Sequence, residues 1–215
     1  FFDRYSQISI GKLITARTTD ELVENLKETE YYAPLKKIKD TDNVTLYDYN
    51  LALDLYYYTS TWKEQKKILK KSDLELFMRD RGSKIDLLNI QWIYRAKKYY
   101  NMKPADIYLM LIPIHYKLST ELVKDMVEAP GVEEFENVVI RTTYARHYNF
   151  KQNLTMEQMY ADCLHHLYTA DRRKNPYSVS AINTYLFLKE EELKKLTTVM
   201  ECVRYGLNPG ETAAY

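Results

Sequence analysis

Apolar side chains recur at helical spacing along most of the chain. In the last long pattern they form one side, made of Ile182, Leu186, Leu193, Leu196, Val199, Met200 and Val203. An earlier pattern carries Met159, Cys163, Leu164 and Leu167. This spacing matches the 3.6-residue period of an amphipathic α-helix, and no alternating strand pattern persists. We therefore expect an all-α fold.

Capping residues mark where helices begin. Thr18 and Glu21 match the capping box, in which a threonine side chain and a carboxylate three residues later satisfy each other's backbone amides. Thr155 and Gln158 match it again. Pro104 suits the first turn of a helix, where no amide donor is needed. We expect that helix to end before Pro113.

The end of the last long pattern is also marked. Gly206 suits a left-handed helix cap. The residues after it resemble the start of a further helix, through Asn208, Pro209 and Glu211.

The chain resembles itself. Ala16 and Tyr31 have counterparts at Ala129 and Tyr144, at one constant spacing. Two later blocks recur in the same order, pairing residues 52–60 with 162–170 and residues 86–104 with 191–209. Repetition at a fixed period is typical of helical-repeat proteins. We therefore expect two related helical-bundle repeats, over residues 1–117 and 118–215.

The composition narrows the class of protein. Lysine and arginine number 31 against 30 aspartates and glutamates, so the net charge of +1 argues against a nucleic-acid partner. Two cysteines without metal-type spacing fit reduced thiols in a cytosolic protein. The most apolar stretch, residues 107–116, is about half the length that spans a bilayer. We expect no direct membrane span.

Few residues suggest chemistry. Asp162, Cys163, His165 and His166 offer metal-ligand types, but adjacent histidines point in different directions on a helix. No phosphate-binding loop is present, and the 21 tyrosines fit cores and interfaces better than base stacking. We expect no catalytic residue, no cofactor, no metal and no small-molecule substrate.

Two segments carry a resemblance to a known family. TYLFLKEEELKKLTTVMECVRYGLNPGE resembles the terminal pattern of the C subunit of V-type ATPases and ATP synthases, a relative of the eukaryotic d subunit. KIDLLNIQWIYRAKKYY is similar to the family's internal Asp-x-x-Asn pattern, here Asp86 and Asn89, followed by Arg95. The repeat starts at Ala16 and Ala129 also resemble the family's.

The resemblance implies a fold and a function. The family has three helical repeats in a funnel, so this chain is expected to match two of them, with an upstream repeat absent. The implied function is non-catalytic coupling, linking the rotor axle of the soluble head to the membrane proteolipid ring for ion transport. It would act peripherally, on the cytoplasmic side of the membrane. The alternatives are a free-standing cytosolic helical-repeat adaptor, or a metal-binding or nucleic-acid-binding protein.

Overall fold

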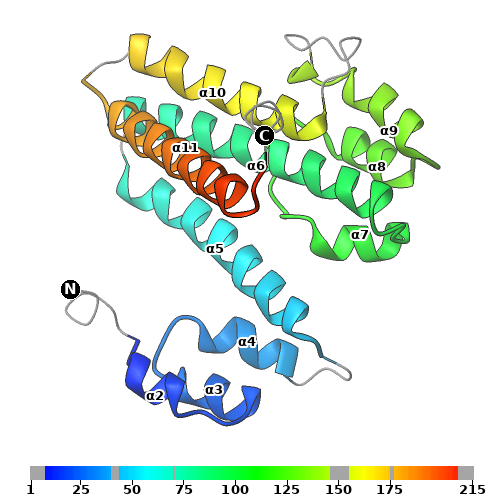
Figure 1. Cartoon of the computed structure of the whole chain (residues 1–215). Coiled ribbons are helices and arrows are strands. Elements are labelled where there is room, and N and C mark those ends of the chain that lie inside the picture. The colour runs from blue at the N-terminus through cyan, green and yellow to red at the C-terminus, as the bar shows by residue number, and fades with distance from the viewer. Residues whose placement is uncertain (1–7, 40–43, 70, 146–154, 175–176, 208–215) are drawn as a thin grey trace.

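A computed structural model describes residues 8–39, 44–69, 71–145, 155–174 and 177–207 (Figure 1). All regular secondary structure in these ranges is helical, which confirms the predicted all-α fold. The helices are α2 (Ile10–Ile14), α3 (Thr19–Asn25), α4 (Tyr32–Lys39), α5 (Leu46–Ile68), α6 (Lys71–Lys98), α7 (Pro104–Met110), α8 (Thr120–Glu128), α9 (Val132–Val139), α10 (Met156–Lys174) and α11 (Val179–Arg204).

Helix α6 is the central element of the fold. It contacts α5, α8, α9, α10 and α11, and α10 and α11 also pack against each other. Figure 1 shows α5 leading away from this group to a small bundle of α2, α3 and α4. The described helices of the main body therefore share one long spine.

The cores follow this arrangement. The largest apolar cluster surrounds the second half of α6 and draws buried side chains from α7 to α11, including Ile90, Ile93, Phe135 and Met159. A small separate cluster of Val23, Leu26 and Leu35 holds the α2–α4 bundle together. A third cluster, around Ile85, lies between α5, α6 and the segment after α7.

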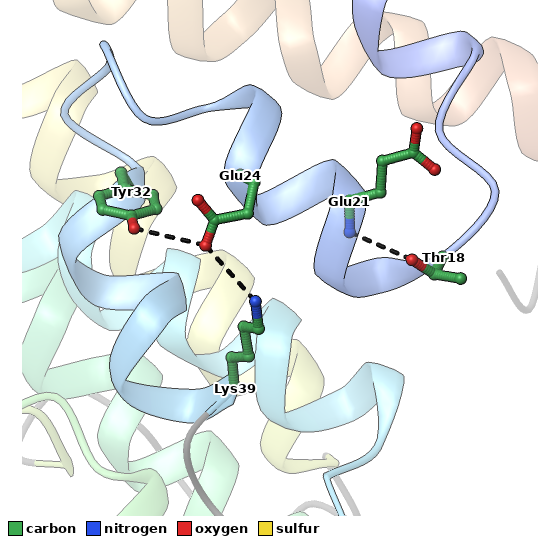
Figure 2. Close-up of polar contacts among 5 residues, drawn as sticks. All are labelled: Thr18, Glu21, Glu24, Tyr32 and Lys39. Atoms are coloured by element: carbon green, nitrogen blue, oxygen red, sulfur yellow. Dashed lines mark hydrogen bonds and ion pairs between the residues drawn. The ribbon is translucent and has the colours of Figure 1, made fainter.

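Polar contacts tie the small bundle together (Figure 2). The Thr18 hydroxyl accepts the Glu21 amide at 3.1 Å, which confirms Thr18 as the cap of α3. The Glu21 carboxylate accepts the amide of Arg17 at 2.9 Å and not that of Thr18, so the reciprocal half of the predicted capping box is shifted by one residue. Glu24 on α3 accepts hydrogen bonds from Tyr32 and Lys39 on α4, both at 3.4 Å. These contacts are exposed, so they contribute little to stability.

The predicted cap of α10 is also confirmed. The Thr155 amide donates to the Gln158 side chain at 2.8 Å, and the Gln158 amide donates back to the Thr155 hydroxyl at 3.2 Å. Pro104 occupies the first turn of α7, as expected. These helix starts follow from side chains that satisfy amides left free by the first turn.

Helices α6 and α11 are each followed by a residue with positive φ. Asn101 and Gly206 both adopt positive φ, at 46° and 70°, as predicted for Gly206. After them, the Met102 amide donates to the Ala96 carbonyl and the Leu207 amide donates to the Cys202 carbonyl, both at 3.0 Å. The helix start predicted at 208–211 lies outside the described residues. The two repeats and their boundary at 117/118 stay predictions.

Helix α11 does not pack through the apolar side of its sequence pattern. The apolar side that the spacing defines does not face the core, because Ile182, Leu186, Leu193 and Met200 are all more than half exposed. The inner face of α11 instead buries Ser180, Thr184, Phe187 and Cys202. The periodicity predicts the helix correctly but not the face that packs.

Asp80 on α6 is buried without a hydrogen bond. It is 2% exposed, and neither carboxylate oxygen has a hydrogen-bond partner among the described residues. The Arg79 guanidinium lies nearby, with its Nε 3.8 Å from Oδ1 of Asp80. Burial raises the pKa of Asp80 to about 6, against a smaller lowering by Arg79.

This pKa predicts that Asp80 destabilises the fold as the pH rises. The folded state holds the proton more tightly than the unfolded state, so stability falls between about pH 4 and about pH 6, by about 3 kcal/mol in full. We expect Asp80→Asn to be more stable than the parent by about 2 kcal/mol at about pH 7.5 and nearly equal to it at about pH 4. Urea unfolding at both pH values measures this. The exposed Asp54→Asn is the control, and a pH-independent effect at Asp80 would contradict the assignment.

Candidate functional site

The residues considered as metal ligands lie on α10. Asp162, His165 and His166 are exposed, whereas Cys163 is partly buried with its sulfur 3.7 Å from the Tyr144 carbonyl. Burial raises the pKa of Cys163 to about 11, so the thiol is protonated at neutral pH. No cluster of three potential ligands forms in the described part of the chain. The absence of metal and catalytic residues stays a prediction, which zinc analysis of a chelator-washed sample would check.

A buried cluster of hydrogen-bonded polar groups lies instead in the middle of α6. Asp86 is completely buried. Its carboxylate accepts the backbone amides of Tyr116 at 3.0 Å, Lys117 at 2.7 Å and Leu118 at 3.2 Å. It also accepts the Tyr144 hydroxyl at 2.7 Å. One side chain therefore holds both the connector before α8 and the segment after α9.

Asn89, one turn further along α6, holds the same connector closer to α7. Its amide nitrogen donates to the Ile112 carbonyl, and its oxygen accepts the Ile112 amide, both at 3.0 Å. The Asn89 side chain thus replaces a backbone partner for a residue that has no helix or strand of its own. Asp86 and Asn89 are the two residues of the Asp-x-x-Asn pattern.

Gly82 allows the connector to approach α6 closely. A Cβ atom on Gly82 would lie 2.5 Å from Cγ and 2.7 Å from Cβ of Tyr116, closer than real Cβ contacts occur. The requirement here is for space, since Gly82 lies inside the helix. The absence of a side chain brings the Tyr116 amide within reach of Asp86.

Lys97 adds a contact at the far end of α6. Its ammonium donates to the carbonyls of Val127 at 2.7 Å and Ala129 at 2.6 Å, at the C-terminal end of α8. A cation is favourable there because these carbonyls lack partners inside the helix. Burial lowers the pKa of Lys97. We call Gly82, Asp86, Asn89 and Lys97, with their partners, the α6 joint.

The α6 joint has the properties of a structural site. Burial, followed by the nearby Asp86 charge, raises the pKa of Tyr144 far above its usual range, so the hydroxyl stays a donor. The four donors to Asp86 that the described residues supply are three backbone amides and one buried tyrosine hydroxyl, all held in place by the fold. The joint can therefore hold chain segments rigidly.

The sequence singles out some of these residues but does not indicate what they do in the fold. Asp86 and Asn89 stand out as a pattern, because a carboxylate and an amide lie within an apolar stretch of helix. Arg95, which follows them in the pattern, is exposed. Gly82 and Lys97 carry no such signal, because their partners are far along the chain.

Removing the charge at the joint should cost much of the stability. We expect Asp86→Asn to lose about 3 kcal/mol or more, because an amide offers one acceptor and two donors to four donors. Tyr144→Phe, which removes one hydrogen bond, should lose about 1 to 2 kcal/mol. Urea unfolding measures both, with the exposed Glu75→Gln on α6 as control. Equal stability of Asp86→Asn and the parent would contradict the joint.

The close approach at Gly82 is tested separately. Gly82→Ala should destabilise the fold by about 2 kcal/mol or more, because the Tyr116 Cβ is fixed by its backbone and cannot move aside. Gly11→Ala is the matched control, since a Cβ there meets nothing within 4 Å. It should raise stability slightly through helix propensity. If Gly82→Ala behaves like Gly11→Ala in thermal unfolding, the close contact is not required.

No described helix combines the length and apolar character needed to cross a membrane.

Comparison with known proteins identifies relatives. The family model described as "ATP synthase (C/AC39) subunit" matches residues 1–215. The C subunit of the A-type ATP synthase from Methanosarcina barkeri is 25% identical over 210 residues, covering 95% of this chain and 56% of the relative. Its namesake from Methanosarcina mazei is 31% identical over 140 residues, covering 65% of this chain and 37% of the relative.

A third relative is likewise matched over only part of its own length. The C subunit of the A-type ATP synthase from Pyrococcus abyssi is 24% identical, with 93% of this chain and 55% of the relative covered. The chain thus spans about half the length, or less, of these curated relatives. No solved structure gave a significant match. Since the family model covers every residue of the sequence, the chain belongs to the ATP synthase (C/AC39) subunit family.

Proposed function

We propose that this chain belongs to a non-catalytic coupling subunit of an ATP synthase, which links the central rotor axle to the membrane proteolipid ring. The observation that carries the proposal is the family match over the whole chain. The named relatives are subunits of A-type ATP synthases, so a role within that complex is the direct extension. The subunit would act at the cytoplasmic face, without crossing the membrane.

The architecture suits a part that transmits force. Helix α6 runs for 28 residues and packs against α5, α8, α9, α10 and α11, so load applied at one end is passed on through the close-packed clusters along its length. The α6 joint adds buried hydrogen bonds between this spine and the segments beside it. A close-packed core whose segments are also joined by buried hydrogen bonds deforms little under load. Torque transfer requires this rigidity.

The proposal predicts binding to two separate partners. We expect the tagged 215-residue chain to retain both the isolated axle subunits and the detergent-solubilised proteolipid ring of the same organism's ATP synthase. The full-length relative from Methanosarcina barkeri, paired with its own complex, is the positive control. Because the chain spans only part of such a protein, its binding should be weaker than the control's. Retention of neither partner by a folded chain would refute the coupling role.

A further inference from the structure

A polar cavity of about 240 Å³ lies among helices α5, α6, α10 and α11. Tyr57, Asp80 and Tyr168 line it from the first three of these helices. Leu186 and Glu190 line it from α11, and both are exposed, so the cavity is open to solvent on that side. A small molecule can therefore enter it from outside.

Asp80 brings two hydrogen-bond acceptors to this cavity. The residue is 2% exposed, and neither carboxylate oxygen accepts a hydrogen bond among the described residues. The Arg79 Nε, at 3.8 Å, is too far from Oδ1 for a hydrogen bond. A buried carboxylate is costly until donors reach it. A ligand that carries a positively charged donor would remove this cost.

Arg81 brings a cation that the fold holds in place. Its Nη2 donates to the Thr61 hydroxyl on α5 at 2.8 Å. Its guanidinium carbon lies 4.9 Å from the ring centre of Tyr57 and 6.0 Å from that of Phe77. The Arg81 Nε has no hydrogen-bond partner within the described ranges. Arg81 is therefore a positioned cation with a donor left for an anionic group.

The charges around the cavity favour one class of ligand. Asp80 and Glu190 contribute two carboxylates, and Arg81 and Lys84 contribute two cations. Glu190 pairs with Lys194 at 3.1 Å, and no ion pair joins the four lining charges to one another in the part of the chain that the structure describes. A simple anion would meet two carboxylates, and a simple cation would meet two cations. A molecule with one group of each sign fits better.

The volume of the cavity sets the size of this molecule. A protein cavity of about 150 Å³ can hold benzene, so this one has room for on the order of ten non-hydrogen atoms. A helix from another part of the protein or from a partner is about 10 Å across and does not fit. Phe77, Leu186 and Phe187 are also among the lining residues, so part of the wall is apolar. An amino acid with an apolar side chain matches this size and lining.

We propose that the cavity binds a small zwitterion of amino-acid size, with its ammonium group on Asp80, its carboxylate on Arg81 and an apolar side chain against Phe187. The ligand would join α6 to α11 through contacts that the chain alone does not make. The proposal goes beyond the coupling role and does not depend on it, because all the lining residues belong to the described helices.

The first experiment tests whether the ligand needs both charges. The probes are L-leucine, 4-methylpentanoate, which lacks the ammonium group, and 3-methylbutylamine, which lacks the carboxylate. They are titrated against the 215-residue chain at about pH 7.5, where Asp80 is ionised, and binding is followed by saturation-transfer difference NMR. We expect a Kd for leucine of about 1 mM or tighter, and at least about tenfold weaker binding of each analogue.

Two outcomes of this titration would overturn the proposal. One is the absence of leucine binding up to about 10 mM, in which case water alone fills the cavity. The other is equal binding of all three probes, which would show an apolar site without charge recognition.

The second experiment assigns each charge to its side chain. Asp80→Asn should weaken leucine binding at least about tenfold and abolish the preference for leucine over 4-methylpentanoate. Arg81→Gln should abolish the preference for leucine over 3-methylbutylamine. Arg95→Gln, at an exposed position of the same helix, is the matched control and should bind leucine like the parent.

Folding is checked by urea unfolding of each variant. Because Asp80→Asn is expected to be the more stable protein at this pH, its loss of binding would not come from unfolding. Unchanged leucine binding by a folded Asp80→Asn variant would contradict the assigned site.

Discussion

The buried Asp86 carboxylate is the interaction on which the rest of the fold depends. A buried charge is costly unless donors surround it, and here three consecutive amides and one tyrosine hydroxyl do so. These donors come from segments 30 to 58 residues away in the chain. The carboxylate can therefore be satisfied only when the connector before α8 and the segment after α9 are both in place. That requirement couples the two halves of the main body through α6.

Asp80 shows what the same chemistry costs when the partners are missing. It lies nearly two turns before Asp86 on the same helix and is buried almost as deeply, yet neither of its oxygens accepts a hydrogen bond among the described residues. One carboxylate thus organises the fold, while the other destabilises it above its pKa. Burial alone does not determine whether a charged residue stabilises the fold. The number of hydrogen-bond donors that reach its carboxylate determines it.

Local features are predictable from the sequence, and long-range ones are not. The caps at Thr18 and Thr155 and the left-handed Gly206 follow from rules that act within a few residues. The role of Asp86 depends on partners that no local pattern names. The inner face of α11 is equally hard to predict, because its buried residues include Ser180 and Thr184, while the apolar side of the pattern lies outside.

The most direct test of the central claim is amide hydrogen exchange of the connector in the unmodified chain. Tyr116, Lys117 and Leu118 belong to no helix, so their amides should exchange quickly unless Asp86 holds them. We predict protection close to that of the α6 core amides, with exchange only on global unfolding. The amide of Lys103, an exposed residue just before α7, provides the fast reference. Exchange of Lys117 and Leu118 at the rate of Lys103 would contradict the account.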